Sequence, residues 1–208
     1  MKKLLLLLGI VFTVQLAFAQ RTWFDAELSG KIVKRLEFSV SPNVRFKEDF
    51  ELNEYFLQTG LEYKFSKYLR LGAGYRFGYN INGEEHESFG RFNLDAKTGV
   101  EWKNFSPKFR LRFTNADDFS EDNEITNYLR YRFKLEYKIK KLDLEPYILT
   151  EWYHDIDAGE FSKSRYEAGL EYKLNKHNKI GACYRVNHYL NSDKNNRNII
   201  GLSYKFSL

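Results

Sequence analysis

A short motif, Leu-Glu-Tyr-Lys, recurs along this chain and alternates apolar with polar side chains. It occurs at residues 61–64, 135–138 and 170–173, and looser copies lie at 100–103 and 202–205. Because successive side chains of a β-strand point to opposite faces, each copy predicts a strand with one apolar and one charged face. The copies recur every ~32–39 residues, the length of two strands and two connections. This repetition predicts a series of hairpins that close into a large antiparallel barrel.

Eleven segments of such alternation follow one another between about Thr22 and Leu208. The connections predicted to be short lie near residues 31–34, 66–67, 103–104, 140–141 and 175–178, and longer polar ones lie near 47–53, 80–88, 115–124, 155–163 and 191–196. Short periplasmic turns and longer extracellular loops are typical of bacterial outer-membrane barrels. We therefore predict an all-β fold, an antiparallel up-and-down transmembrane β-barrel of about 10–12 strands.

The strand number stays open at this stage, because single-chain bacterial barrels usually have an even number of strands. Ten strands would close if the first segment lay outside the wall, and twelve would close if one segment were missed. The third solution is an odd barrel closed by a parallel pair, which is the rarer arrangement.

The first nineteen residues predict a secretory signal peptide. Met1-Lys2-Lys3 is basic, Leu4–Phe18 is almost entirely apolar, and Ala17-Phe18-Ala19 has the small-x-small pattern of a cleavage site. We expect cleavage after Ala19 and one barrel domain over residues 20–208. Beyond this leader no stretch approaches 18 apolar residues, so the sequence excludes a transmembrane helix.

Alternation alone does not say which face of the barrel is apolar. About eight strands make an interior that side chains can fill, whereas wider barrels leave a lumen. An Arg or Lys facing lipid costs ~2–4 kcal/mol near the midplane, and the apolar phase of the segments is nearly free of charge. We therefore predict that the apolar side chains face lipid and that charged ones form a slightly basic network in the lumen. The predicted network comprises Arg70, Arg76, Arg110, Arg112, Arg130, Arg132, Glu62, Glu101, Glu136, Glu167 and Glu171.

Aromatic residues recur at the ends of the predicted strands and make up 17% of the chain. Tyr and Trp are amphipathic and favour the two interfaces between membrane and water. We expect Trp102, Tyr63, Tyr137 and Tyr172 near the rim with short turns, and Trp152 near the rim with longer loops.

The combined pattern resembles a bacterial domain-of-unknown-function family of outer-membrane β-barrels. The residues that carry the resemblance are Trp23, the Gly-Leu-Glu-Tyr-Lys repeats at 60–64 and 169–173, Arg45-Phe46, and the alternating C-terminus at 204–208. That C-terminus is similar to the terminal signal read by the barrel assembly machinery, although it ends in Leu rather than Phe or Trp. The resemblance implies the outer membrane of a Gram-negative bacterium as location, its lipid as surroundings and the assembly machinery as partner, but no activity.

Composition argues against nucleic-acid binding and against a disulfide-stabilised fold. The formal net charge is +5, which becomes +3 once Lys2 and Lys3 leave with the leader, and no compact basic cluster points to nucleic acid. The single cysteine, Cys183, excludes an intramolecular disulfide. Its place in a strand pattern predicts a buried, inert thiol.

The candidate residues for an enzymatic role are the four histidines and the acids near the predicted loops. His154 and Asp155 are adjacent, so on a strand they would point to opposite faces and would not bond each other. No Gly-x-Ser-x-Gly, His-Glu-x-x-His or phosphate-binding loop is present. The acidic stretch 117–124 lacks the spacing of a calcium loop. We predict no catalytic residue, no cofactor and no metal.

Three functional hypotheses follow. The first is a structural or porin-like outer-membrane barrel whose lumen, if it conducts, prefers anions. The second is an outer-membrane hydrolase with His154 and Asp155 at the loop rim. The third is a secreted soluble barrel that binds an apolar ligand. The sequence leaves open the solute, the oligomeric state and whether the lumen is open or plugged.

Overall fold

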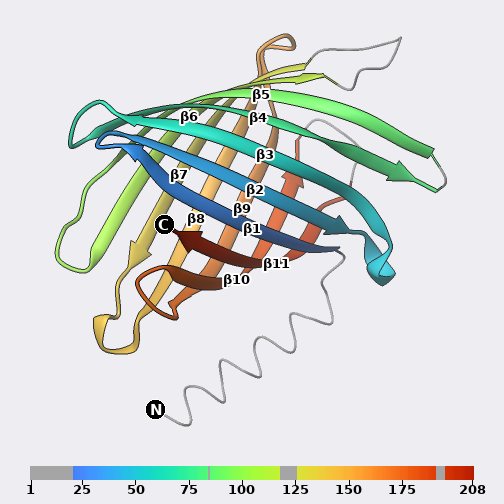
Figure 1. Ribbon diagram of the computed structural model, residues 1–208. Helices are drawn as coiled ribbons and strands as arrows, with labels where there is room; N and C mark the ends of the chain where they lie inside the picture. Colours follow the sequence, from blue (N-terminus) through green and yellow to red (C-terminus); the bar gives the residue numbers. More distant parts are fainter. Residues whose placement is uncertain (1–20, 84, 118–125, 191–194) are drawn as a thin grey trace.

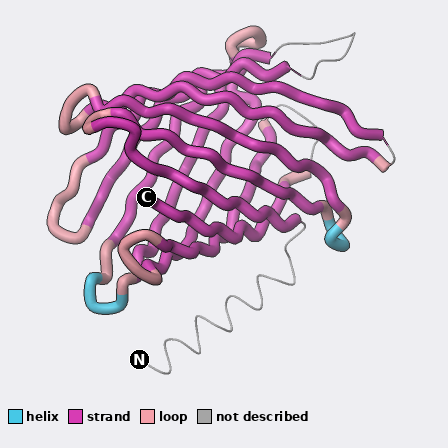
Figure 2. The backbone as a smooth tube through the Cα atoms, viewed as in Figure 1, coloured by secondary structure: helices cyan, strands magenta, loops and turns pink. Residues whose placement is uncertain are grey.

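The computed structural model describes residues 21–83, 85–117, 126–190 and 195–208, and these form one closed β-barrel (Figure 1). The strands are β1 (Arg21–Val33), β2 (Leu36–Phe46), β3 (Leu52–Lys64), β4 (Leu69–Asn82), β5 (Glu85–Gly99), β6 (Phe105–Asp117), β7 (Thr126–Tyr137), β8 (Leu144–Asp155), β9 (Glu160–Lys173), β10 (Asn178–Tyr189) and β11 (Arg197–Ser207). Figure 2 shows how little helix accompanies them: two 3₁₀ turns, η1 (Glu48–Phe50) and η2 (Lys140–Leu142). Within these residues no helix is long and apolar enough to span a membrane.

The barrel closes through a parallel pair. Each strand pairs antiparallel with its neighbour in sequence, and β1 also pairs parallel with β11, from Arg21 opposite Ile199 to Ser29 opposite Ser207. The first segment is therefore a full member of the wall, and the odd barrel is the correct one of the three solutions. Because β1 and β11 run in the same direction, the start of β1 and the end of β11 lie at opposite rims.

We call the rim with the connections 34–35, 65–68, 100–104, 138–143 and 174–177 the turn rim, and the opposite one the loop rim. Two of the loop-rim connections are shorter than predicted. β4 runs on to Asn82 and pairs with Glu85 across a tight turn at Gly83, whose φ is 66°. The polar residues at 80–88 lengthen this hairpin beyond the apolar part of its strands. The connection between β8 and β9 is likewise only residues 156–159.

The outside of the barrel is apolar and the inside is polar. Among the described residues, thirty-four large hydrophobic side chains are exposed and only eight hydrophobic residues are buried, whereas thirteen buried residues are polar or charged. On β7, Phe133 is 53% exposed while Glu136 is 7% exposed. Water-soluble proteins bury their large apolar side chains and rarely expose contiguous apolar patches of this extent.

Glycines on the inner face of the strands make room for lumen aromatics. A Cβ at Gly78 would overlap with Phe56 on β3, and Phe56 contacts Phe89 with ring centroids 6.3 Å apart. A Cβ at Gly169 would lie 2.6 Å from the ring of Tyr147. The ring of Tyr147 therefore lies over Gly169, its partner on the next strand, in space that any larger residue would fill.

Candidate functional site in the lumen

Two cavities occupy the lumen. The loop-side cavity has a volume of ≈ 700 Å³ and reaches Arg21, Asn53 and Arg197 near the loop rim. The turn-side cavity has a volume of ≈ 680 Å³ and reaches Lys67 and Val100 near the turn rim. Both are lined by Arg110, Arg132, Lys134 and Lys205. These four basic side chains therefore surround the level at which the two cavities meet.

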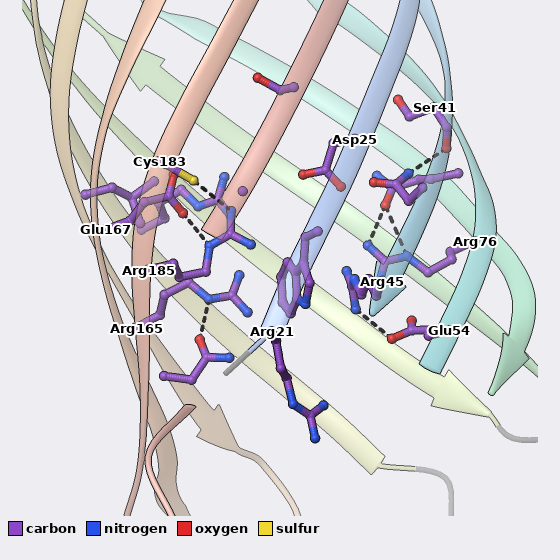
Figure 3. A pocket seen from close by; sticks show the side chains of 18 of the residues that line it. Arg21, Asp25, Ser41, Arg45, Glu54, Arg76, Arg165, Glu167, Cys183 and Arg185 are labelled. Atoms are coloured by element: carbon purple, nitrogen blue, oxygen red, sulfur yellow. Dashed lines mark hydrogen bonds and ion pairs between the residues drawn. The ribbon is translucent and has the colours of Figure 1, made fainter. Parts of the chain in front are cut away.

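The loop-side cavity carries a large excess of basic side chains. Among the described residues, fourteen basic ones line it: Arg21, Arg45, Arg76, Arg91, Arg110, Arg112, Arg130, Arg132, Lys134, Lys163, Arg165, Arg185, Arg197 and Lys205. Five acidic ones line it: Asp25, Glu27, Glu54, Glu167 and Glu171. Even with the buried acids Asp95 and Glu151, which pair with lining arginines, the basic groups are twice as numerous. Figure 3 shows Arg45 and Arg76 facing Arg165 and Arg185 across the cavity.

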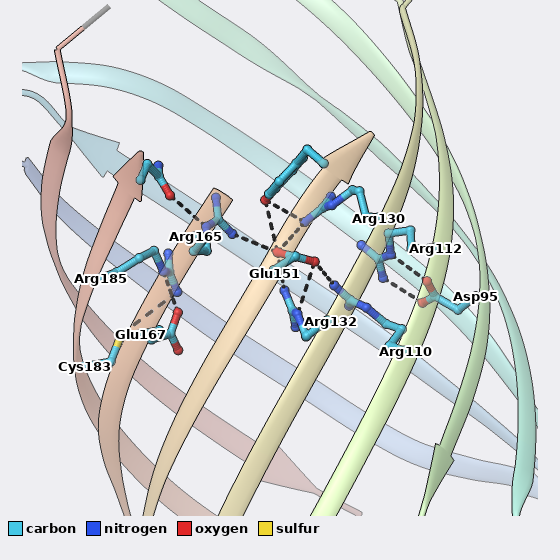
Figure 4. A network of polar contacts seen from close by, with 12 residues as sticks. Asp95, Arg110, Arg112, Arg130, Arg132, Glu151, Arg165, Glu167, Cys183 and Arg185 are labelled. Atoms are coloured by element: carbon cyan, nitrogen blue, oxygen red, sulfur yellow. Dashed lines mark hydrogen bonds and ion pairs between the residues drawn. The ribbon is translucent and has the colours of Figure 1, made fainter. Parts of the chain in front are cut away.

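One carboxylate organises the centre of the lumen. The side chain of Glu151 on β8 is fully buried, and its oxygens accept hydrogen bonds from Arg110 at 2.7 Å, Arg130 at 3.0 Å and Arg132 at 3.1 Å (Figure 4). Arg165 lies 3.4 Å away, and the hydroxyl of Tyr153 donates to the same carboxylate at 3.1 Å. The group joins β6, β7, β8 and β9. Four guanidiniums share one negative charge, so the cluster remains cationic.

Smaller ion pairs surround this centre. Arg112 binds both oxygens of Asp95, at 2.6 and 2.7 Å. Arg185 donates to Glu167 at 2.6 Å, and the hydroxyl of Tyr147 donates to the same carboxylate at 2.7 Å. A fork of two parallel N–H donors is the strongest geometry for an arginine and a carboxylate. These pairs fix their guanidiniums and leave few of their donors available to a ligand.

Among the described residues, the turn-side cavity is lined by six lysines and three arginines, and by the acids Glu62, Glu101 and Glu136. Glu136 contacts Lys108 at 2.6 Å and Lys134 at 2.7 Å. Glu171, which lines the loop-side cavity, contacts Lys205, which lines both cavities, at 2.9 Å and Lys179 at 3.0 Å. Several of these lysines are partly exposed, and exposed ion pairs contribute little to stability. Both ends of the lumen are therefore rich in cations, with lysine prevailing around the turn-side cavity and arginine around the loop-side cavity.

Most of the predicted lumen residues do lie on the inner face. Arg110, Arg130 and Arg132 converge on Glu151, and Arg112 pairs with Asp95. Arg70 contacts Glu62 at 2.9 Å, and Arg76 donates to the amide oxygen of Gln58 at 2.8 Å. Glu136, Glu167 and Glu171 take part in the ion pairs described above.

Glu101 differs from this prediction. It lies in the connection between β5 and β6 at the mouth of the turn-side cavity, and its side chain is 75% exposed. A hydrogen bond from Lys138 at 2.6 Å lowers the pKa of Glu101. The motif copy at 100–103 falls where β5 has already ended at Gly99, so its alternation no longer assigns a side of the wall.

Sequence reasoning missed the role of Trp23. This residue lies out of phase with the outward Phe24 and Leu28, and the structure buries it in the lumen opposite Gly201. Its ring centroid lies 4.0 Å from the guanidinium carbon of Arg45 and 4.5 Å from that of Arg185. Trp23 thus connects β1 to β2 and β10 across the parallel seam. The phase of Trp23 within its segment is the signal that identifies it as inward-facing.

The predicted interface aromatics all lie on the outside or at a rim. Trp102 is 65% exposed in the connection after β5, and Tyr63, Tyr137 and Tyr172 are exposed close to the turn rim. Trp152 lies near the loop rim, where its ring contacts those of Phe161 and Tyr166 at 6.0 and 6.3 Å.

The residues considered for catalysis and metal binding are not joined. The His154 ring contacts Phe161 at 5.2 Å, and the carboxylate of Asp155 accepts hydrogen bonds from the backbone of Asp157 and Ala158. Across the described ranges, no three His, Cys, Asp or Glu residues are grouped to hold a metal ion. Most of the acidic stretch at 117–124, namely residues 118–124, lies outside those ranges. Cys183 is buried beside Arg185, as predicted.

A family model described as a protein of unknown function (DUF2490) matches residues 20–198. No curated protein matches the chain significantly.

Proposed function

The chain belongs to the DUF2490 family, and from the geometry of its barrel we propose that it resides in the bacterial outer membrane and offers small anions a water-filled, cation-lined lumen. The family description assigns no activity, so the proposal rests on the molecule itself. The observation that carries it is the inversion of polarity, with apolar side chains outside and a twofold excess of basic groups around the loop-side cavity.

The outer surface supports the membrane location. The shortest strands have 11 residues, which at ~3.3 Å per residue and ~40° tilt span roughly 28 Å. An apolar band of about 25 Å fits within that height. A soluble barrel carrying an apolar ligand needs the opposite arrangement, because its apolar side chains must line the cavity.

The lumen supports the preference for anions. A cavity lined by one sign of charge between low-dielectric walls attracts counter-ions and raises their local concentration. Any anion that passes from one cavity to the other must pass Arg110 and Arg132, which line both. The same contacts of these arginines with Glu151 also favour a second candidate, a barrel with a closed lumen and a structural role.

Conductance of the purified protein in planar lipid bilayers tests the proposal and separates the two candidates. We expect single-channel steps. Under a KCl gradient, the reversal potential should shift toward the equilibrium potential of chloride. Protein boiled in detergent before addition serves as the control. If protein that heat-modifiable migration shows to be a folded barrel gives no steps, the structural candidate is the one that stands. A cation-selective current would contradict the account of the lumen.

A further inference from the structure

Two arginines of the loop-side cavity face each other, and among the described residues neither has an ion pair. Arg76 on β4 and Arg91 on β5 are directly opposite in the antiparallel register. Like charges in such a cross-strand pair repel each other and destabilise the sheet. Within the described part of the chain, no carboxylate lies within 4 Å of either guanidinium, and the acceptor that Arg76 has is the neutral amide of Gln58.

A comparison with the neighbouring strands shows that this pair is unusual. On β6 and β7, Arg110 lies opposite Arg132 and Arg112 lies opposite Arg130. Those pairs receive buried carboxylates from the adjacent strands, Glu151 from β8 and Asp95 from β5. The chain therefore compensates its other opposed arginines and leaves the pair at Arg76 and Arg91 cationic.

Further cations and buried donors surround the same space. Lys163 on β9 holds its ammonium 4.0 Å from the ring centroid of Tyr153, and among the described residues it has no ion pair. The Nε atoms of Arg45, Arg91 and Arg130 are buried and lack a hydrogen-bond acceptor. A buried donor without an acceptor costs about 1–3 kcal/mol. Water in the cavity can satisfy such donors, but it brings no negative charge.

Aromatic rings hold the cations in place. The guanidinium of Arg76 stacks on Phe56 at 3.8 Å and that of Arg45 on the same ring at 4.5 Å, while Arg91 lies 5.7 Å from Phe89. Stacking on a ring fixes the plane of a guanidinium and directs its N–H edges away from the face it covers. Planar donors held this way suit the two-point recognition of phosphate and carboxylate oxygens.

We propose that the loop-side cavity is a binding site for a multivalent oxyanion, such as a molecule carrying phosphate groups, held by Arg76 and Arg91 on one wall and by Lys163 on the other. Figure 3 shows Arg76 beside Arg45 on its side of this cavity. The anion would supply the charge that Glu151 and Asp95 supply to the neighbouring arginines. The proposal rests on the water-filled lumen proposed above, but it does not require that the lumen conducts.

Titration calorimetry of the folded barrel in zwitterionic detergent tests the proposal, with inorganic pyrophosphate as the probe at constant ionic strength. We expect one pyrophosphate per barrel and a rise in unfolding temperature that chloride does not produce. The double variant Arg76→Gln/Arg91→Gln should bind at least tenfold more weakly. The matched control is Arg70→Gln, which lies on the same face of β4 at the turn rim, pairs with Glu62 and should change the affinity less than twofold.

Stability without pyrophosphate gives a second readout. If the two arginines serve a ligand, then removing their repulsion should leave the unfolding temperature of the double variant equal to or higher than that of the wild type. Lys163→Gln on the opposite wall should weaken binding as well, in a protein that keeps both arginines. The proposal is overturned if wild-type protein does not bind pyrophosphate, if these variants bind it like wild type, or if the double variant without pyrophosphate is less stable.

Binding and conduction fail separately. Pyrophosphate binding without channel steps would remove the conducting function and keep the site. Anion-selective steps without pyrophosphate binding would keep the channel and remove the site.

Discussion

Replacement of Glu151 by glutamine should destabilise the barrel more than any other single neutralisation of an acid in the lumen. The carboxylate has no solvent-exposed surface and accepts from Arg110, Arg130 and Arg132 within 3.1 Å. Glutamine keeps the volume but loses the charge, and its amide group places N–H donors against guanidinium donors. Removing one partner of a buried ion pair costs about 3–5 kcal/mol. The Arg132 side chain is 28% exposed, so water can solvate part of its charge. We therefore expect the lower end of this range, a loss of ~3 kcal/mol in the free energy of unfolding, or about a hundredfold in the folding constant.

Reversible urea unfolding in detergent or lipid vesicles, followed by tryptophan fluorescence, measures this free energy. Glu101→Gln is the matched control, because that carboxylate is exposed and pairs with Lys138 alone, and its unfolding midpoint should not move. Adding Arg132→Gln to Glu151→Gln should recover part of the loss, since one uncompensated cation is removed. If Glu151→Gln costs less than ~1 kcal/mol, hydration by water rather than the carboxylate stabilises the four guanidiniums, and the account of the network is wrong.

Three further predictions concern the wall. Trp23→Ala should lower the free energy of unfolding by ~3 kcal/mol, measured by the same urea assay, because the indole packs between Arg45 and Arg185 across the parallel seam; an unchanged midpoint would contradict this. Gly78→Ala should reduce the heat-modifiable, folded fraction on a gel, because the new Cβ would overlap with the Cβ of Phe56 and with the backbone oxygen of Tyr55, whereas equal folding would show that the backbone of β3 and β4 can shift. In intact cells an antibody should reach an epitope tag placed before Arg21 and not one placed after Leu208, because β1 starts at the loop rim and β11 ends at the turn rim; equal access to both would refute this topology.

The sequence predicts the architecture well because alternation reports directly on the two faces of a strand. Leu61, Leu135 and Leu170, from the three full motif copies, are all exposed on the outside. Closure was harder to predict, since nothing within β1 or β11 alone distinguishes parallel from antiparallel pairing. The length of the loop at 80–88 was overestimated, because the apolar alternation stops several residues before the hydrogen bonds between β4 and β5 do.

The site was predictable in kind but not in detail. Alternation places an acid such as Glu151 on the inner face, but convergence of four arginines on it depends on the register of β6 to β9, which the sequence does not encode locally. The uncompensated pair of Arg76 and Arg91 likewise emerges only from the β4–β5 register. The inward position of Trp23 could be predicted only from its phase, which is opposite to that of the outward Phe24 and Leu28.

The central claim, that the outer face of the barrel contacts lipid tails while the charges face the lumen, can be tested with the native tryptophans. Single-tryptophan proteins would be reconstituted in vesicles containing brominated lipids, which quench indoles that they touch. With Trp23→Phe and Trp102→Phe, the remaining Trp152 on the outer face should be strongly quenched. With Trp102→Phe and Trp152→Phe, the remaining Trp23, buried in the lumen, should keep its fluorescence. Quenching of Trp23 with sparing of Trp152, or failure of the folded barrel to enter vesicles, would contradict the account.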